Sequence, residues 1–207
     1  MSVKNLVLKY YGSKFRLSEW IIQFFPAHRH YVEPFGGGAA VLLRKKPSLL
    51  ETYNDLNKDL VNFFRVLREQ PGELIQQINL TPWARAEYEY CLEEIEIENP
   101  VERARRFFFR IWMNLQGSMI THKSNWRRHN KGRKVITTIV KQETLFDAAE
   151  RFKGVQIENR DAFRLIKEMD SPDTLFYLDP PYVFSTRSTS KAYSHEMTNA
   201  AHREFAE

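Results

Sequence analysis

The chain has 207 residues, of which 43% are hydrophobic and 28% charged, so it can form one sizeable domain and is not disordered by composition. Its apolar runs are far shorter than the roughly 20 residues that span a bilayer, and its N-terminus lacks the apolar core of a signal peptide, so we expect a cytoplasmic protein with no membrane partner. The single cysteine, Cys91, excludes an intrachain disulfide and a multi-cysteine zinc site, and we expect it to pack inside a helical segment.

The net charge of +5 is distributed unevenly. Residues 101–134 carry ten Lys or Arg against one acid, Glu102, which gives this segment a net charge of +9 and leaves −4 for the rest of the chain. A basic segment in an otherwise acidic chain predicts a site for a polyanion.

The first third of the chain predicts a β-α-β-α unit. Apolar side chains recur at helical spacing before Pro26 and again before Pro71, and two short runs have the character of strands. We expect, in order, a helix at 13–25, a strand at 30–33, a helix at 39–46, a strand at 49–53 and a helix at 55–69.

The middle of the chain predicts helices with no strand between them, at 73–79, 82–97 and 101–115. Residues 135–140 have strong β propensity, which predicts a loop or hairpin. The alternation of helices and strands then resumes. We expect, in order, a helix at 143–152, a strand at 155–158, a helix at 162–169, a strand at 174–178 and a helix at 199–207.

This alternation predicts an α/β fold with a doubly wound, mostly parallel sheet. Ligands of such sheets bind at the carboxyl ends of the strands, and both unusual turns of the chain follow strands. The glycine turn, residues 36–38, follows the first strand, and Asp179-Pro180-Pro181-Tyr182 follows the last. The fold therefore places Asp179 beside the ligand of the glycine turn.

The turn after the last strand has the groups needed to methylate an amino group of a π-system. Such an amine is a poor nucleophile because its lone pair is delocalised, so a catalyst must accept hydrogen bonds from both N–H groups. Asp179 can accept one and the Pro180 carbonyl the other, while the Tyr182 ring offers a stacking face. Two prolines restrict the backbone of this turn. The alternative is that the prolines only end a strand and that the aspartate is an ordinary turn residue.

The glycine turn lets the backbone approach a ligand closely, and the helix after it favours a carboxylate or phosphate. Its spacing is not that of a dinucleotide site. Asp55 follows the second strand about 20 residues later, where an acid commonly binds ribose hydroxyls. Asp161 follows the third strand and can hold an adenine amine or, alternatively, cap a helix.

Five segments met in order resemble the motifs of the Dam-type (D12 class, alpha group) DNA adenine-N6 methyltransferases: residues 9–14, 33–39, 53–57, Asp161, and 179–182. The resemblance covers nearly the whole chain. It implies that S-adenosylmethionine is the cofactor and that the methyl group goes to N6 of a flipped adenine in duplex DNA. It also implies a fold of the S-adenosylmethionine-dependent methyltransferase type, with a catalytic domain at 1–70 and 141–207 and an inserted target-recognition lobe at 71–140.

Residue by residue, the resemblance implies a catalytic turn of Asp179, Pro180, Pro181 and Tyr182. The implied cofactor residues are Tyr10, Lys14, Glu33, Pro34, Phe35, Gly36, Gly37, Gly38, Asp55, Asp161 and Asp179. Tyr10 and Lys14 would line the pocket, residues 34–38 would pass under the methionine moiety, and Asp55 would hold the ribose. No metal is implied.

The lobe contains most of the residues that we expect to bind DNA. The candidates are Lys9, Arg110, Asn114, Gln116, Ser118, Lys123, Asn125, Arg127, Arg128, Lys131, Arg133 and Lys134. We expect Arg103, Arg105 and Arg106 to join the basic residues of this set in contacting phosphates, although any single arginine can instead lie on a solvated helix face. We expect Phe107, Phe108 and Phe109 to pack the lobe. His122 and His129 lack neighbouring ligands in the sequence and do not predict a metal site.

Two other functions are compatible with these motifs: an RNA adenine-N6 methyltransferase, because the catalytic turn does not read the sugar, and a non-catalytic DNA-binding remnant. Members of the resembling family continue well beyond their catalytic turn, whereas only 25 residues follow Tyr182 here. We therefore expect a truncated sheet with an unpaired edge, which a second copy or a partner would complete, and reduced stability or activity. A short GATC-like target is the first expectation for specificity.

Overall fold

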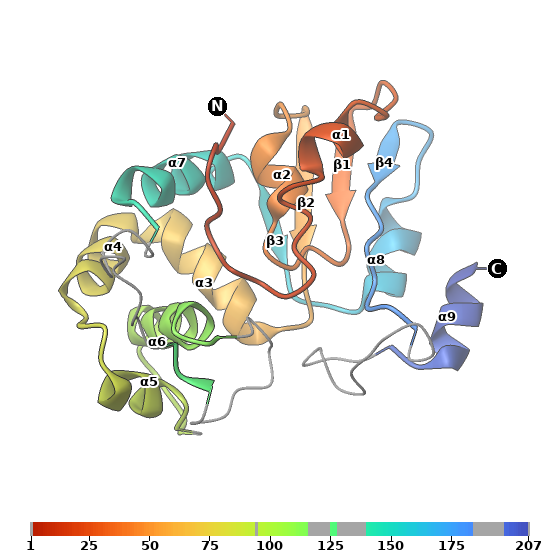
Figure 1. The fold of residues 1–207 in the computed structure, drawn as a ribbon. Helices are drawn as coiled ribbons and strands as arrows, with labels where there is room; N and C mark the ends of the chain where they lie inside the picture. The colour runs from red at the N-terminus through yellow and green to blue at the C-terminus, as the bar shows by residue number, and fades with distance from the viewer. Residues whose placement is uncertain (1, 94, 116–124, 128–139, 184–196, 207) are drawn as a thin grey trace.

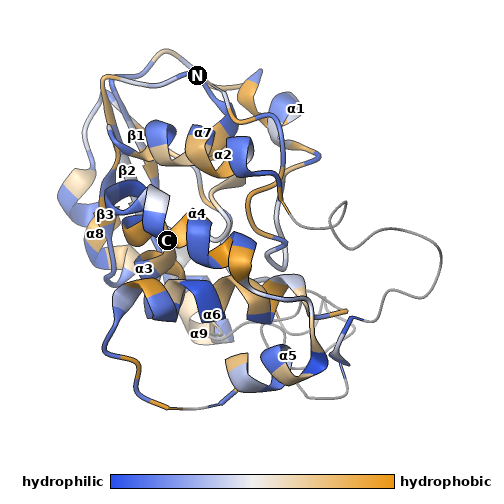
Figure 2. Ribbon diagram, turned by 90° about the vertical axis from the view of Figure 1, so that its left-hand side faces the viewer, coloured by the Kyte–Doolittle hydropathy of each residue, from blue (hydrophilic) through white to orange (hydrophobic). Residues whose placement is uncertain are grey.

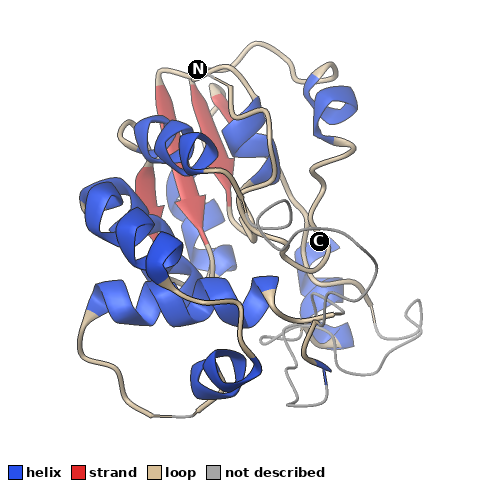
Figure 3. Ribbon diagram, turned by 60° about the vertical axis from the view of Figure 1, so that its left-hand side comes forward, coloured by secondary structure: helices blue, strands red, loops and turns tan. Residues whose placement is uncertain are grey.

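A computed structural model of the chain describes residues 2–93, 95–115, 125–127, 140–183 and 197–206. Its centre is a four-stranded parallel sheet with the order β3-β2-β1-β4, in which all arrows run the same way (Figure 3). The strands are β1 His30–Glu33, β2 Leu50–Asn54, β3 Gln156–Glu158 and β4 Thr174–Phe176. This arrangement confirms the predicted α/β fold with parallel strands.

Helices cover both faces of the sheet. The helix α8 lies on one face, and α1, α2 and α7 lie on the other (Figure 2). The described helices are α1 Ser18–Ile22, α2 Ala40–Arg44, α3 Lys58–Glu69, α4 Pro71–Leu80, α5 Arg85–Cys91, α6 Pro100–Trp112, α7 Gln142–Phe152, α8 Ala162–Met169 and α9 Asn199–Ala206. None of these helices is long and apolar enough to cross a bilayer. The loop or hairpin expected at 135–140 lies outside the described residues, apart from residue 140.

The first helix is much shorter than the expected 13–25. Its N-terminal part is replaced by turns, because the Phe15 carbonyl accepts hydrogen bonds from Ser18 Oγ (2.8 Å) and from Arg44 Nη1 (3.2 Å). The apolar side chains of this helix do not all face the core: Trp20 and Phe24 are 60% and 65% exposed. Helical spacing alone did not reveal that this element sits at the surface.

Polar caps set two other helix starts. The Asn57 side chain accepts hydrogen bonds from the backbone N–H groups of Asp59 and Leu60, at 3.0 and 3.2 Å, so α3 begins at Lys58 and not at residue 55. Asn99 caps α6 in the same way, with Pro100 at the first helical position. The helix expected at 82–97 ends at Cys91, before a run of glutamates that a helix C-terminus disfavours.

Aromatic side chains join the sheet to the helices beyond it. The Phe64 ring stacks on Phe152 at 4.5 Å between centroids, and Phe63 stacks on Phe108 at 6.1 Å. Phe107, Phe108 and Phe109 are all buried, so they are packing residues as expected, and Cys91 is buried as expected. Figure 1 shows α4, α5 and α6 gathered beside α3, on the side away from the strands. One hydrophobic core therefore runs through both expected parts of the chain, and their division at residues 70 and 141 stays a prediction.

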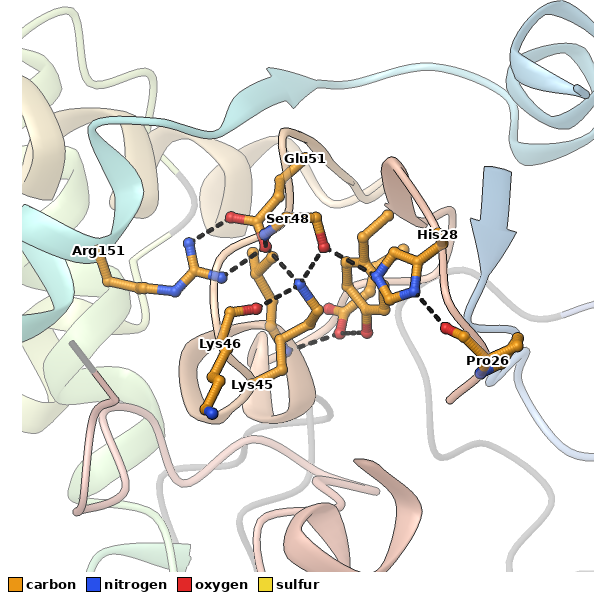
Figure 4. Close-up of polar contacts among 10 residues, drawn as sticks. Pro26, His28, Lys45, Lys46, Ser48, Glu51 and Arg151 are labelled. Carbon is orange, nitrogen blue, oxygen red and sulfur yellow. Dashed lines mark hydrogen bonds and ion pairs between the residues drawn. The ribbon is translucent and has the colours of Figure 1, made fainter. Parts of the chain in front are cut away.

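A buried ionic cluster lies at the start of β2 (Figure 4). The Glu51 carboxylate binds Lys45 Nζ at 2.6 Å and Arg151 Nη2 at 2.7 Å, and all three side chains are almost wholly buried. Lys45 Nζ also donates to Ser48 Oγ, which contacts His28 Nε2. Burial alone would raise the pKa of Glu51, but the hydrogen bonds from Arg151 and Lys45 lower it below its ordinary value. The cluster joins α2, β2 and α7.

We expect Glu51→Ala to lower the free energy of unfolding by about 3–5 kcal/mol, because two buried cations lose their counter-charge. Urea denaturation at neutral pH measures this loss. Since the folded-state pKa of Glu51 is lowered, its contribution is present at neutral pH and disappears as the pH falls through that pKa. In the control Glu150→Ala, which removes an exposed ion pair with Lys153, the change should stay below about 1 kcal/mol. Equal effects in the two variants would contradict the role of the cluster.

Candidate active site

The glycine turn that follows β1 fits tightly against the end of β2. A Cβ atom added at Gly36 would lie 2.3 Å from Tyr53 Cε2 and 3.0 Å from the Asn54 carbonyl oxygen. Gly37 has a φ of +48°, and its carbonyl accepts a 2.7 Å hydrogen bond from the Tyr53 hydroxyl. These constraints require glycine at 36 and favour it at 37.

Asn54 ties this turn to its neighbours. Its Nδ2 donates to the Pro34 carbonyl (2.8 Å) and to the Arg160 carbonyl (3.0 Å), and its Oδ1 accepts from the Arg160 N–H at 3.0 Å. The side chain is fully buried. One amide thus connects the turns that follow β1, β2 and β3. Asn54 belongs to the motif at residues 53–57, but its residue type alone did not predict this structural role.

The two acids that follow β2 and β3 are both anchored. Asp55 accepts hydrogen bonds from the Gly37 N–H (2.9 Å) and from the Asn57 N–H (2.8 Å), one on each oxygen. Asp161 Oδ1 accepts from the Arg164 N–H at 3.0 Å and so caps α8. Asp161 also lines the cavity described next, so it has the capping role and remains available to a ligand.

A cavity of about 290 Å³ opens at the carboxyl ends of the strands, close to the lower bound of roughly 300 Å³ for small-molecule sites. All eleven residues expected to bind a cofactor line it: Tyr10, Lys14, Glu33, Pro34, Phe35, Gly36, Gly37, Gly38, Asp55, Asp161 and Asp179. The sequence did not single out Phe163, Tyr177 or Met197, which also line it. Among the described residues, no three His, Cys, Asp or Glu side chains are grouped to hold a metal ion.

Asp179 faces the cavity from the end of β4, where the ladder extends past the strand because the Tyr177 N–H donates to the Val32 carbonyl at 2.9 Å. Lys14 Nζ contacts both oxygens of the Asp179 carboxylate, at 2.8 and 2.5 Å. Burial opposes the charge of Lys14, but its hydrogen bonds to Asp179 and Tyr182 prevail and raise its pKa. The Tyr182 ring is 46% exposed beside this pair. Pro181 lines the cavity, whereas the other two residues of the predicted catalytic turn, Pro180 and Tyr182, are not among the lining residues.

Glu33 forms a buried wall of the cavity. It accepts hydrogen bonds from the Tyr31 hydroxyl (2.6 Å) and from the Leu42 N–H in α2 (2.8 Å). Burial, which outweighs these bonds, raises the pKa of Glu33 to about 7. Because the folded-state pKa is raised, the protonated form favours folding at low pH, and this contribution is lost as the pH rises through about 7.

Comparison with known proteins agrees with this geometry. The sequence model of the D12 class of N6 adenine-specific DNA methyltransferases matches residues 10–207. The chain belongs to this family. A type II methyltransferase of Lactococcus lactis subsp. cremoris, M1.LlaDCHI, is 28% identical over 200 residues, covering 91% of this chain and 69% of the relative. M.MjaIII, a type II methyltransferase of Methanocaldococcus jannaschii, is 26% identical over 204 residues, covering 88% and 70%. A DNA adenine methylase of Vibrio cholerae is 35% identical over 79 residues, covering 37% and 27%.

The chain is thus a D12 methyltransferase, and its activity is the methylation of adenine N6 in DNA. The methyl group requires a donor, and the cavity beside Asp179 lies where a parallel sheet binds its ligands. The expectation of an RNA methyltransferase is accordingly set aside.

The basic segment of this D12 methyltransferase is partly neutralised by acids from elsewhere in the chain. Arg103 and Arg110 both bind the Asp59 carboxylate at 2.8 Å. The other two arginines of α6 are buried: Arg105 binds Glu102 and Glu87, and Arg106 binds Glu102. The expectation that Arg105 and Arg106 contact phosphates is therefore wrong, because these guanidinium groups pack inside the lobe.

The structure describes four of the other residues that we expect to bind DNA: Lys9, Asn114, Asn125 and Arg127. Lys9 Nζ donates to the Asn114 and Leu115 carbonyls at 3.3 and 3.1 Å, and Asn114 is fully buried. Asn125 and Arg127 are partly exposed and pair through their backbones with Leu115 and Met113, next to α6. The structure does not describe the rest of the candidates, namely Gln116, Ser118, Lys123, Arg128, Lys131, Arg133 and Lys134.

We expect Gly36→Ala to destabilise the protein by about 1–3 kcal/mol, because the added methyl group overlaps Tyr53 and a backbone oxygen that cannot move freely. Urea denaturation is the measurement. Gly72→Ala is a matched control with no atom within 4 Å of the new Cβ, and in α4 it should stabilise by up to about 1 kcal/mol. A stabilising or neutral Gly36→Ala would show that the turn is not closely packed.

Asn54→Ala should cost about 2–3 kcal/mol of unfolding free energy, because the Pro34 carbonyl and both backbone groups of Arg160 lose their partner. Thermal or urea unfolding tests this value. Asn79→Ala, on an exposed position of α4, should change stability by no more than about 0.5 kcal/mol. If both variants unfold alike, the amide of Asn54 does not hold the turns together.

Proposed function

We propose that S-adenosylmethionine is the methyl donor and that the cavity at the carboxyl ends of the strands binds it. The lining fits this molecule: the turn at 36–38 exposes backbone without side chains, and Asp55 and Asp161 offer carboxylates to hydroxyl and amine groups. The hydrogen bonds that Asp55 accepts from the Gly37 and Asn57 N–H groups fix its carboxylate in one orientation. When bound, the donor supplies an electrophilic methyl group on a sulfonium.

The proposed reaction takes place at Asp179. Its carboxylate accepts a hydrogen bond from one N–H of the target amine, and the Pro180 carbonyl accepts a hydrogen bond from the other. The exposed Tyr182 ring stacks on the base. The adenine reaches these groups only outside the base stack, so the base is flipped from duplex DNA. The observation that carries the proposal is that the Asp179 carboxylate opens onto the same cavity as the glycine turn and Asp55.

We further propose that residues 71–140 recognise the DNA and that the partly exposed Asn125 and Arg127 belong to the contact surface. Lys and Arg side chains bind DNA phosphates through their charge, so the affinity for DNA should fall steeply as the salt concentration rises. Activity on DNA is also the reason to expect a cytoplasmic enzyme. A second copy or a partner on the edge of β4 remains our prediction, because β4 ends the described sheet.

Asp179→Ala should lower the rate of methyl transfer at least about 100-fold, because the target amine loses the carboxylate that accepts its hydrogen bond and lets its lone pair localise. Transfer of a tritiated methyl group from S-adenosylmethionine to unmethylated DNA measures the rate. Sequencing the DNA of cells that express the chain identifies the recognised site.

The matched control is Asp173→Ala. Asp173 is exposed at the opposite end of β4, and its described contacts are made by its backbone carbonyl, so this variant should keep wild-type activity. Affinity for DNA should be largely unchanged in both variants. Methyl transfer by Asp179→Ala at the wild-type rate would refute the assignment.

A further inference from the structure

The Lys14 ammonium group donates hydrogen bonds to three oxygen atoms of the site. It donates to Asp179 Oδ1 (2.8 Å), to Asp179 Oδ2 (2.5 Å) and to the Gly12 carbonyl (3.0 Å). The same nitrogen lies 5.0 Å from the centre of the Tyr182 ring. Both oxygens of the carboxylate and one face of the ring are therefore in contact with an amine of the protein itself.

The target adenine needs the same two groups. Its exocyclic amine must donate to Asp179, and its ring must stack on Tyr182. We call the Asp179 carboxylate and the Tyr182 ring together the amine seat. We propose that Lys14 is a positioning residue that occupies the amine seat in the free enzyme, and that the target adenine must displace it before the methyl group is transferred. This inference rests on the proposed role of Asp179.

The surrounding backbone allows this exchange without a change of fold. The turn before Lys14 is fixed by the hydrogen bond from the Ser13 N–H to the Tyr10 carbonyl and by the positive φ of Gly12, 75°. The backbone carbonyl of Lys14 accepts from the Leu17 N–H at 2.9 Å. Four methylene groups separate this anchored backbone from the ammonium group, so the side chain can turn away while the main chain stays in place.

The exchange also affects specificity. A base that cannot donate two hydrogen bonds does not replace those that Lys14 makes, so the occupied seat discriminates against it. The apparent affinity for the correct base is lowered by the fraction of enzyme whose seat is free. For a partly exposed ion pair such as Lys14–Asp179, this factor is up to about fivefold.

Equilibrium binding to two duplexes tests the displacement. One duplex carries the recognised sequence, and the other has an abasic position in place of the target adenine, so only the first brings an amine to the seat. Both are titrated with saturating S-adenosylhomocysteine to prevent turnover. Lys14→Met should bind the adenine duplex about fivefold more tightly than the wild type does and bind the abasic duplex equally well.

Two variants control this measurement. Lys14→Arg keeps the charge and the donors toward Asp179, so its ratio of the two affinities should be that of the wild type. Lys4→Met removes an exposed lysine remote from the site and should leave both affinities unchanged. Weaker binding of the adenine duplex by Lys14→Met, or an unchanged ratio, would overturn the proposal, because Lys14 would then be an ordinary contact to the substrate or a bystander.

Nuclear magnetic resonance of the wild-type enzyme gives a second readout that does not depend on the folding of a variant. The hydrogen-bonded ammonium of Lys14 should give a ¹H–¹⁵N signal, which the adenine duplex abolishes or shifts and the abasic duplex preserves. A signal unaffected by the adenine duplex contradicts displacement. Retained activity in Asp179→Ala would instead refute the amine seat itself, so the two failures are distinguishable.

Discussion

The site depends on the buried amide of Asn54. Parallel strands deliver their following turns to one edge of a sheet, but they do not fix how those turns stand relative to one another. Asn54 supplies that constraint. Its side-chain amide joins the carbonyl of Pro34 to the backbone of Arg160, and its backbone carbonyl accepts a 2.8 Å hydrogen bond from the Gly36 N–H. The glycine turn, Asp55 and Asp161 are consequently held in one frame around the cavity.

The periodicity of the sequence predicted the strands, most helices and the edge of the sheet where the site lies. The helix at 162–169 was predicted with its observed bounds, because Asp161 is a local cap that the sequence displays. The shortened first helix was not predictable, since its start is set by Arg44, which is distant in the sequence. The burial of Arg105 and Arg106, and the ion pairs of all four α6 arginines, were not predictable either. Counting charge within one segment overlooks Asp59 and Glu87, which neutralise those arginines from other helices.

The pairing of Arg103 and Arg110 with Asp59 also links α6 to the part of the site that contains Asp55. Burial alone would raise the pKa of Asp59, but hydrogen bonds from both arginines lower it, so the carboxylate stays charged. Asp59 lies in the first turn of α3, and its N–H donates to the cap residue Asn57, which is two residues beyond Asp55. The helices expected to recognise DNA are thus fastened to the start of α3. Three hydrogen bonds in series, from Arg110 to Asp59, from Asp59 to Asn57 and from Asn57 to Asp55, therefore connect α6 with the site.

The contact between Lys14 and Asp179 also fixes the charge of the lysine. An enzyme that methylates amines keeps a lysine amine beside its acceptor carboxylate, where a neutral lysine would itself be a strong nucleophile. A protonated amine has no lone pair to attack a methyl group. Burial favours the neutral form, but the hydrogen bonds to Asp179 and Tyr182 raise the pKa of Lys14 and keep it protonated. The carboxylate proposed to accept a hydrogen bond from the adenine amine thus also keeps the neighbouring lysine protonated.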